Sequence, residues 1–572
     1  MKTLHSFLMM SALAVCFTAC NDEIEGGNVP TETSNSVYLQ FSLDLPSGSR
    51  SATTSDEEDG YVTSEDGTEV GKDYENQINQ ILLVFTDENN TYLTSTDVVS
   101  VSPTTDTENQ YVITIPPQRL EDCVSPEPEE GTGTTIPKTA YVYAFCNPTD
   151  ELRALAGASA GSARVEDFIN KAHTLTDGES ENASVWQSSN FLMSNAVKHL
   201  ITLPTSWNEY LSSSHSFEIG PIKVERSAAR FDYKAKNNNQ YPIYDDVDVK
   251  TTNTNPGIYI ELTDIALINM SKSFYYLRRV SDNGQNAQSA VCGVETANNY
   301  VVDTDAEEKV NYTSAENWTN KTDNFFYNLE EPETWQWTSL ATISNNTEDN
   351  WGEDKDETKG YHIWRYAIEN TIPQDEQETD ALQKNGITTG VVFRAKIGIT
   401  EDSDVTWTAG EPIYVFENKL YGNWEAVANY ATVHSNSNVA YAYRAVTNGD
   451  YDYKGAGFTI YEPNEDGNYY TYYYYWNRHN DNGKVPDMGP MEFAVVRNNV
   501  YKLSVEAIYR FGYPEGETPD PETPDEEEPD PDPEEPDPEA PKVFFEVKVQ
   551  VLPWVVRVNS ITFGDQDNSG TI

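Results

Sequence analysis

The sequence has few cysteines, few histidines and few basic residues for its length. Among 572 residues there are 5 Cys and 7 His, and no two cysteines are separated by only two residues. This excludes a disulfide-stabilised scaffold and a zinc site with ordinary ligand spacing. Lys and Arg number 37 against 94 Asp and Glu, a net charge of −57. Such an acidic chain disfavours nucleic acid as a partner, because phosphate contacts need clustered basic side chains.

Long hydrophobic runs are also missing. The apolar stretch around Leu8–Val15 is too short for a permanent transmembrane helix and predicts an export signal over residues 1–19. It ends in Phe17-Thr18-Ala19-Cys20, which resembles a bacterial lipobox and predicts lipidation of Cys20. An ordinary signal peptide beside a chance cysteine is the alternative. The lipidated precursor is expected at the cell outer membrane.

What is present is strand patterning with a high tyrosine content. Aromatic residues make up 12% of the chain and Tyr alone numbers 36, which suits strands that have one hydrated face. The first strand is predicted at Val37–Leu45 by strict alternation of apolar residues. Its apolar positions are Val37, Leu39, Phe41, Leu43 and Leu45.

Further strands are predicted through the rest of the chain, which makes the expected fold all-β. They are Ile78–Phe85, Tyr111–Ile115, Ala140–Cys146, Ile222–Tyr233, Ile258–Ile268, Gly390–Ile397, Ile413–Phe416, Tyr469–Trp476, Phe493–Val496 and Tyr501–Val505. Helical patterning is confined to small patches such as Ser162–His173 and Asn423–Ala428. Residues 281–356, rich in polar side chains with isolated Trp, are expected to be long surface insertions.

Residues 514–541 form a linker of different composition. Its 28 residues include ten Pro and fourteen Asp or Glu, so it favours an extended, self-repelling chain with no core of its own. A second alternating strand follows, and a short extended piece completes it after Pro553. The apolar positions of both are Val543, Phe545, Val547, Val549, Val551, Trp554 and Val556.

The two tethered strands have the same pattern, so either could occupy one slot in a sheet. A strand left exposed is an aggregation hazard, so the C-terminal strand should dock in its own chain or in another copy. Arg50 is the only Lys or Arg between residues 3 and 71, and it stands among small residues past the first strand. A trypsin-like protease could therefore cut between Arg50 and Ser51, although a solvated loop residue is the plain alternative.

Several segments together resemble the fimbrillins of Bacteroidales, the major subunits of type V fimbriae. They are Val224–Asp232, Phe191–Ser194, Tyr141–Pro148, Tyr474–Asn480 and Met488–Tyr501. The acidic linker followed by a Val/Phe/Trp strand is similar to the shaft subunit of the short fimbria. The insertions in residues 281–390 are long for a plain shaft unit and suggest a specialised subunit.

The resemblance implies two transthyretin-like β-sandwich domains with small helical insertions. It also implies that an arginine-specific protease cuts after Arg50, and that the C-terminal strands of one subunit fill the groove of the next. The expected organisation is a signal peptide at 1–19, a lipidated propeptide with the removable strand at 20–50, a β-sandwich at 51–221, a second sandwich at 222–513, the linker at 514–541 and donor strands at 542–572. Expected partners are other copies, anchor and tip subunits, that protease and an adhesion receptor of the host or of other bacteria.

Enzyme chemistry is not expected. Gly157–Gly161 matches the G-x-S-x-G motif, but the preceding residues 150–155 are helix-like and charged where a nucleophile elbow needs a buried strand. No cofactor or metal site is predicted. The rival function is a monomeric glycan-binding surface lipoprotein, in which aromatic residues such as Tyr470–Trp476 stack on sugars; packing in a core is the alternative for those residues.

Overall fold

The structure is a computed structural model of the whole chain, and the part described is mostly β-strand. It describes residues 36–44, 72–101, 110–126, 136–158, 168–176, 184–187, 190–244, 255–285, 289–292, 300–310, 321–345, 360–373, 387–479, 491–515, 518, 545–553 and 557–562. Within these ranges no helix is long and apolar enough to cross a bilayer. The prediction of an all-β fold with two β-sandwich domains is confirmed.

The N-terminal domain is built on one continuous sheet that contains nine described strands. In sheet order they are β3 (Tyr92–Ser95), β2 (Gln80–Thr86), β6 (Thr139–Cys146), β8 (Met193–Asn195), β10 (Phe217–Arg226), β1 (Val37–Asp44) and β5 (Gln110–Ile115), with β4 (Val99–Ser100) on β2 and β9 (Leu200–Thr202) on β6. The long strand β10 joins the two halves, because its first part pairs with β1 and its last residues pair with β8. The core lies between these halves.

The C-terminal domain has two main sheets that face one another. One follows the order β21 (His362–Ala367), β11 (Ala229–Tyr233), β27 (Asn499–Ile508), β29 (Phe545–Pro553) and β30 (Arg557–Thr562). The other contains β12 (Gln240–Pro242), β13 (Ile258–Ile268), β22 (Gly390–Ile399), β26 (Tyr470–Trp476) and β28 (Tyr513–Pro514), with β20 (Thr338–Ser339) on β13. Tyr233 of the first sheet packs on Phe393 of the second at 6.0 Å between ring centroids, inside the sandwich.

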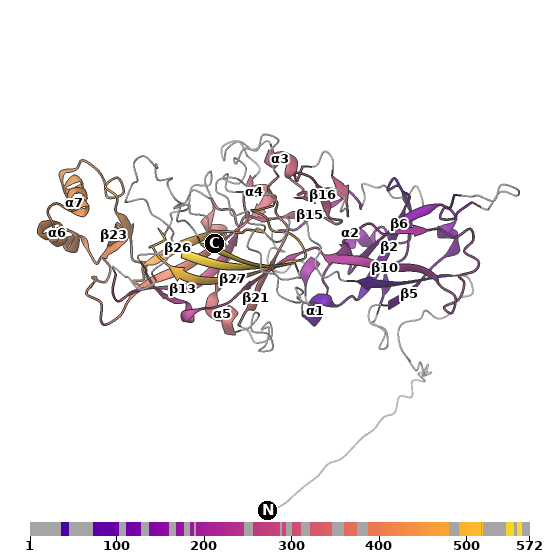
Figure 1. The fold of residues 1–572 in the computed structure, drawn as a ribbon, viewed down its shortest axis with the longest axis horizontal. Helices are drawn as coiled ribbons and strands as arrows, with labels where there is room; N and C mark the ends of the chain where they lie inside the picture. Colours follow the sequence, from indigo (N-terminus) through magenta and orange to yellow (C-terminus); the bar gives the residue numbers. More distant parts are fainter. Residues whose placement is uncertain are drawn as a thin grey trace, which may run out of the picture.

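Smaller elements decorate this frame, and the α6–α7 end forms its own lobe at the left of Figure 1. The small sheets contain β7 (Ala172–Thr174), β14 (Met270–Ser271), β15 (Ser273–Tyr275), β16 (Arg279–Ser281), β17 (Ala290–Val291), β18 (Tyr300–Val301), β19 (Phe325–Phe326), β23 (Ile413–Phe416), β24 (Lys419–Tyr421) and β25 (Thr459–Tyr461). The α-helices are α1 (Asp73–Asn76), α2 (Asp150–Arg153), α3 (Ala306–Val310), α4 (Lys321–Asn324), α5 (Leu340–Asn345), α6 (Trp424–Val433) and α7 (Asn438–Asn448).

The two domains meet through buried ion pairs at the turn between β10 and β11. Arg230 of the C-terminal domain donates to Glu75 of α1 at 2.8 Å and to Asp232 at 2.8 Å, and all three side chains are fully buried. Arg226 adds hydrogen bonds to the carbonyl of Glu75 at 3.1 Å and to the side chain of Asn498 at 3.2 Å. Buried charges need partners of this kind, so the junction holds the domains in a fixed relation.

This junction corrects one strand prediction. Ile222–Tyr233 was predicted as a single strand, but its residues divide between β10 and β11, which belong to sheets of different domains. Apolar residues alternate at Ile222 and Val224, polar residues follow at Arg226 and Ser227, and the alternation resumes in the opposite phase from Ala229, so the pattern does carry a sign of the break. The expected boundary near residue 222 lies inside β10, and the chain changes sheets between Arg226 and Ala229.

Three further expectations were wrong. The helix at Ser162–His173 is not formed in its described part, where His173 lies in β7. Phe493–Val496 contributes a single β-bridge at Val495 in place of a strand. The 281–356 insertions are not purely superficial, because Tyr300 and Val301 are fully buried. The helix at Asn423–Ala428 is confirmed as α6, with Asn423 capping its N-terminus.

Candidate functional site

The first strand occupies an internal slot in the N-terminal sheet. β1 runs parallel to β10 on one side, with Leu39 opposite Phe217 and Leu43 opposite Ile222. It runs antiparallel to β5 on the other side, with Val37 opposite Ile115 and Phe41 opposite Tyr111. A strand with neighbours on both edges leaves a gap in the sheet when it is removed.

The side chains of β1 are part of the core. Val37, Leu39 and Phe41 are fully buried, Leu43 is 1% exposed, and the intervening Gln40 and Ser42 are partly exposed. The predicted alternation holds from Leu39 to Leu43, but the intervening Tyr38, expected on the exposed face, is also fully buried. Burial of four such side chains contributes roughly 6–12 kcal/mol gross, at about 1.5–3 kcal/mol each.

The wall of the slot contains groups that are neutral at ordinary pH. The ring of Phe41 stacks on Tyr111 of β5 at 5.8 Å between centroids. Burial raises the pKa of Tyr111 to about 12, with a further contribution from Cys146. Burial likewise raises the pKa of the Cys146 thiol far above its usual range. Both groups are therefore protonated and unreactive while β1 is in place.

The C-terminal strand joins its own chain by a different kind of contact. β29 pairs antiparallel with β27, from Asn499 opposite Pro553 to Ile508 opposite Phe545, and β30 pairs with its other edge. Four of the predicted donor positions, Phe545, Val547, Val549 and Val551, lie in this strand.

The remaining predicted site residues lie outside the described residues. These are Cys20, Leu45, Arg50, Ser51, Val543, Trp554 and Val556. Lipidation at Cys20 and cleavage between Arg50 and Ser51 therefore stay predictions from the sequence.

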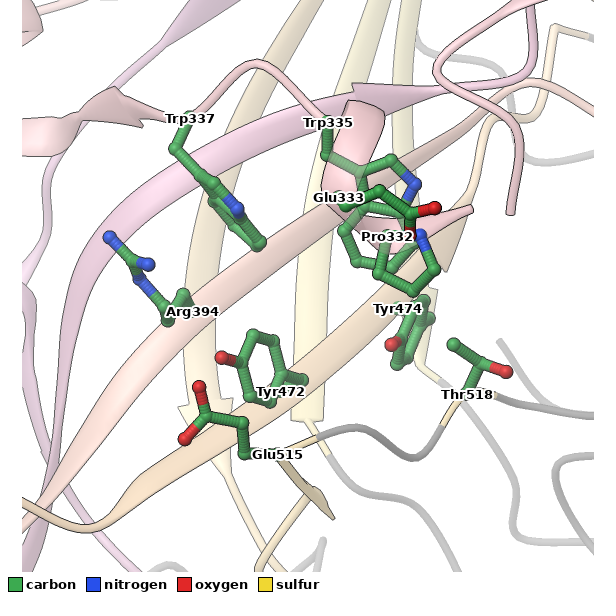
Figure 2. Close-up of a pocket in the computed structure, with 9 residues that line it drawn as sticks. All are labelled: Pro332, Glu333, Trp335, Trp337, Arg394, Tyr472, Tyr474, Glu515 and Thr518. Atoms are coloured by element: carbon green, nitrogen blue, oxygen red, sulfur yellow. The ribbon is translucent and has the colours of Figure 1, made fainter. Parts of the chain in front are cut away.

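A second candidate site is a pocket on the outer face of the C-terminal sandwich, which we call the aromatic pocket (Figure 2). It has a volume of about 280 Å³. Six of the residues that line it carry its chemistry: Trp335, Trp337, Arg394, Tyr472, Tyr474 and Glu515. Tyr472 and Tyr474 are on the face of β26 that is turned away from the core, since successive side chains of a strand alternate.

The rings of the aromatic pocket are arranged as one tilted pair and one edge-to-face pair. Trp337 and Tyr472 have centroids 5.9 Å apart with planes at 57°. Trp335 and Tyr474 have centroids 6.1 Å apart with planes at 77°. The indole N–H of Trp335 donates to the carbonyl of Asn328 at 2.7 Å, which fixes that ring.

Charged groups border the rings. Arg394 donates to Asp264 at 2.9 and 3.1 Å, and its guanidinium lies 4.8 Å from the Trp337 ring centroid. Burial raises the pKa of Tyr472 to about 12; the Glu515 carboxylate adds to the increase and Arg394 opposes it. Tyr472 is therefore a neutral phenol that can donate and accept hydrogen bonds.

Sequence reasoning did not find this pocket. Tyr470–Trp476 was predicted as either a sugar platform or a core strand, and β26 is buried along most of its length. Trp335 and Trp337 stood in a stretch interpreted as a surface insertion. Their i, i+2 spacing places two rings on one side of an extended segment, which is the signal that could have found them.

The G-x-S-x-G match does not have the context of a nucleophile elbow in the described residues. Residues 150–153 are helical, as α2, so a strand does not lead into Gly157–Gly161, and Ser159 itself is outside the described residues. Among the described residues, there is no cluster of three or more His, Cys, Asp or Glu side chains that could hold a metal ion.

Comparison with known proteins gives one family match. Residues 467–560 match the model of the C-terminal part of fimbrillin, the major fimbrial subunit protein type IV. This range contains β26, β27, β28 and β29 and most of β30. No curated protein matches the chain.

Solved structures with a similar arrangement include two from Porphyromonas gingivalis. A fimbrillin (FimA) is 12% identical with a TM-score of 0.35, covering 91% of this chain and 98% of its own. The tip fimbrial protein Mfa3 is 10% identical with a TM-score of 0.33, covering 83% of this chain and 95% of its own. At these values the likeness carries no inference about function. The family match over residues 467–560 confirms the fimbrillin resemblance for the C-terminal segment of this chain.

Proposed function

We propose that this protein is a structural subunit of a cell-surface fimbria that polymerises by strand exchange and supports adhesion. One observation carries the proposal: β1 is a buried, internal strand of the N-terminal sheet, yet it belongs to a short segment from the start of the chain. Loss of this segment leaves two strand edges, β5 and β10, facing an empty slot. The fimbrillin match of the C-terminal segment supports the same assignment.

The trigger we propose is cleavage between Arg50 and Ser51. It would release residues 20–50, including the lipid on Cys20 and the whole of β1, from a precursor held at the outer membrane. The donor would be the strand at Phe545–Pro553 of another copy, tethered by the acidic linker 514–541. Its alternating pattern matches that of β1, and main-chain pairing provides much of the affinity in strand addition.

The alternative is a monomeric glycan-binding surface lipoprotein. Pairing of β29 with β27 of its own chain favours it, because that contact already gives the last strand a place in a sheet. In the polymer, β29 would have to leave β27 and enter the slot of another copy.

The first test is electrophoresis of surface-sheared material, unheated and boiled, from wild-type, Arg50→Ala and Arg50→Lys cells. The expected result is a heat-sensitive ladder in wild type that is lost in both variants. Arg50→Lys keeps the positive charge but removes the arginine side chain that an arginine-specific protease recognises. A ladder that persists in both variants would contradict cleavage at Arg50, and a single band in all three would contradict polymerisation.

A disulfide trap separates the two places of β29. Lys548 pairs with Ser504 of β27, and Gln40 of β1 pairs with Val112 of β5. A chain with Ser504→Cys and Lys548→Cys should form an internal disulfide if β29 stays paired with β27 of the same chain. Cleaved Val112→Cys chains mixed with Lys548→Cys or Gln550→Cys chains should form dimers if β29 enters the slot. The native Cys123, Cys146 and Cys292 are buried with raised pKa values and should not interfere. Internal disulfides with no dimers would leave the monomeric alternative.

A further inference from the structure

The aromatic pocket is a hollow that the fold has not filled. Protein cores are close-packed, with few voids larger than a water molecule, whereas this hollow has a volume of about 280 Å³. Trp337 is half-buried on its rim and Glu333 and Glu515 are exposed there. A packing role alone explains Tyr474, which is 2% exposed, but not the open face that the rings share.

The position of the charged groups follows from strand register. Asp264 of β13, Arg394 of β22 and Tyr472 of β26 are successive cross-strand neighbours on the outer face of one sheet. Asp264 therefore anchors Arg394 beside the Trp337 ring, and the guanidinium is held where it can face a ligand. Positioning by strands gives more rigidity than positioning by loops.

The mixture of charges decides what kind of ligand fits. Arg394 would repel a cation bound between the rings, and the carboxylates of Glu333 and Glu515 would repel an anion. A neutral ring with many hydroxyl groups can accept from Arg394, donate to the two carboxylates and place its C–H face on an aromatic ring. The volume is slightly below the roughly 300–1,000 Å³ of most small-molecule sites, which fits a single sugar ring better than a long chain.

We propose that the aromatic pocket binds a neutral sugar residue of a glycan, with Trp337 and Tyr472 as the stacking surface and Arg394 and Glu515 as the polar contacts. The residues that line this site belong to the C-terminal domain and the start of the linker (Figure 2), whereas the slot of β1 is in the N-terminal sheet. The aromatic pocket would give each subunit of a fibre its own receptor contact.

The test is binding of methyl glycosides to the purified, uncleaved chain, followed by saturation-transfer NMR and tryptophan fluorescence. The probes are the methyl glycosides of glucose, galactose, mannose and N-acetylglucosamine, with sialic acid and choline as the anionic and cationic comparisons. We expect at least one neutral glycoside to bind, and sialic acid and choline not to bind.

Variants assign the binding to this pocket. Trp337→Ala should lower the affinity at least about tenfold, a loss of about 1.4 kcal/mol of binding free energy. The matched control is Trp407→Ala, which removes another partly buried Trp that packs on Tyr469 at 5.3 Å outside the pocket. Glu515→Gln, on an exposed side chain, tests the polar contact without risk to folding and should weaken binding several-fold.

Three outcomes would overturn the inference. The first is that none of the neutral glycosides binds, and the second is that choline or sialic acid binds in their place. The third is that Trp337→Ala and Trp407→Ala have the same affinity for the glycoside. The polymer assay is read separately. A chain that forms ladders but binds no glycoside overturns the inference alone. A chain that binds a glycoside through Trp337 but forms no ladder overturns the proposed function alone.

Discussion

β1 and β29 are strands of similar pattern that join their sheets in different ways. β1 lies between β10 and β5, and its side chains Leu39 and Phe41 are fully buried in the N-terminal core. β29 also has two neighbours, β27 and β30, but its outer neighbour β30 comes from the same C-terminal tail, so the tail as a whole is added to one side of the sheet that contains β11 and β21. The comparison shows that an alternating pattern identifies a strand that can complete a sheet. Which sheet loses its core when the strand is removed is decided by the strand's neighbours and by the burial of its side chains.

The largest expected effect on stability comes from a charge placed on the buried face of β1. Phe41→Asp should cost at least about 4 kcal/mol of unfolding free energy, since an unpaired carboxylate would enter the core. Denaturant unfolding of the uncleaved chain measures it. Gln40→Asp, on the partly exposed face of the same strand, is the control and should change stability by less than about 1 kcal/mol. Equal losses for the two would contradict the burial of β1.

The next effect concerns the junction that joins the two regions. Glu75→Ala should cost about 3 kcal/mol, because it removes one partner of the buried Arg230 and leaves Tyr366 without its acceptor at 2.7 Å. Calorimetry should then resolve two transitions in place of one. Asp97→Ala, which breaks the partly exposed pair with Arg119, is the control and should change stability by no more than about 1 kcal/mol. A single transition in Glu75→Ala would show that the domains are coupled by other contacts.

Removal of β29 should have a smaller effect than damage to β1. Deletion of residues 542–572 should lower stability by about 1–2 kcal/mol and leave the C-terminal domain folded, because strand pairing is largely offset by the entropy of ordering the tail. Thermal circular dichroism and near-ultraviolet signals measure it. If the domain unfolds, β29 is integral to its own sandwich and its donation to another copy becomes untenable.

The last effect is a pH dependence in the C-terminal domain, which is small within any single pH unit. Asp303 and Asp305 both lie 2.8 Å from the buried ammonium of Lys309. Burial raises the pKa of Asp305 to about 7, with the Asp303 charge adding to the increase and Lys309 opposing it. A raised carboxyl pKa stabilises the fold below about pH 4, and this contribution is lost as the pH rises through about 7.

Asp305→Asn removes the titrating group and should therefore flatten the dependence of the unfolding free energy on pH. The expected difference between wild type and Asp305→Asn is on the order of 1 kcal/mol for each pH unit across this window. Urea unfolding of both chains at pH 4, 5, 6, 7 and 8 measures it, with their difference cancelling the titration of the other carboxylates. Parallel curves would show that Asp305 stays ionised throughout.

Much of the fold could be predicted from local pattern. β13 at Ile258–Ile268 and β23 at Ile413–Phe416 have the predicted bounds, and β1 has the predicted start and runs to the last described residue there, Asp44. These strands carry a full alternation or a short apolar run bounded by turn residues, so the local signal is complete. The turn between β2 and β3 also forms from local residues, and Asn90 adopts the left-handed conformation there.

The features that were not predicted correctly depend on contacts between residues that are distant in sequence. The division of Ile222–Tyr233 between two domains is set by Glu75 and Asn498, which are far from it in sequence. The helix α7 was not predicted, because its apolar face packs on a lobe that only the fold assembles. The aromatic pocket joins Trp337 to Tyr472 across the sequence in the same way. Periodicity holds no information about such pairings.

The slot between β10 and β5 has a mechanical consequence for any strand held in it. Hydrogen bonds join β1 to β5 over Val37–Ser42 and to β10 over Leu39–Asp44. A pull along the strand axis loads both ladders in shear, so the bonds must yield together, whereas a pull across the axis would open them one at a time. Because side chains alternate, a slip of one residue would turn the apolar set outward, and the strand would have to advance two residues to find its next fit. A fibre joined through such a slot would therefore resist tension in two ways: by the affinity of the strand for the slot, and by the barrier to moving the strand two residues to its next register.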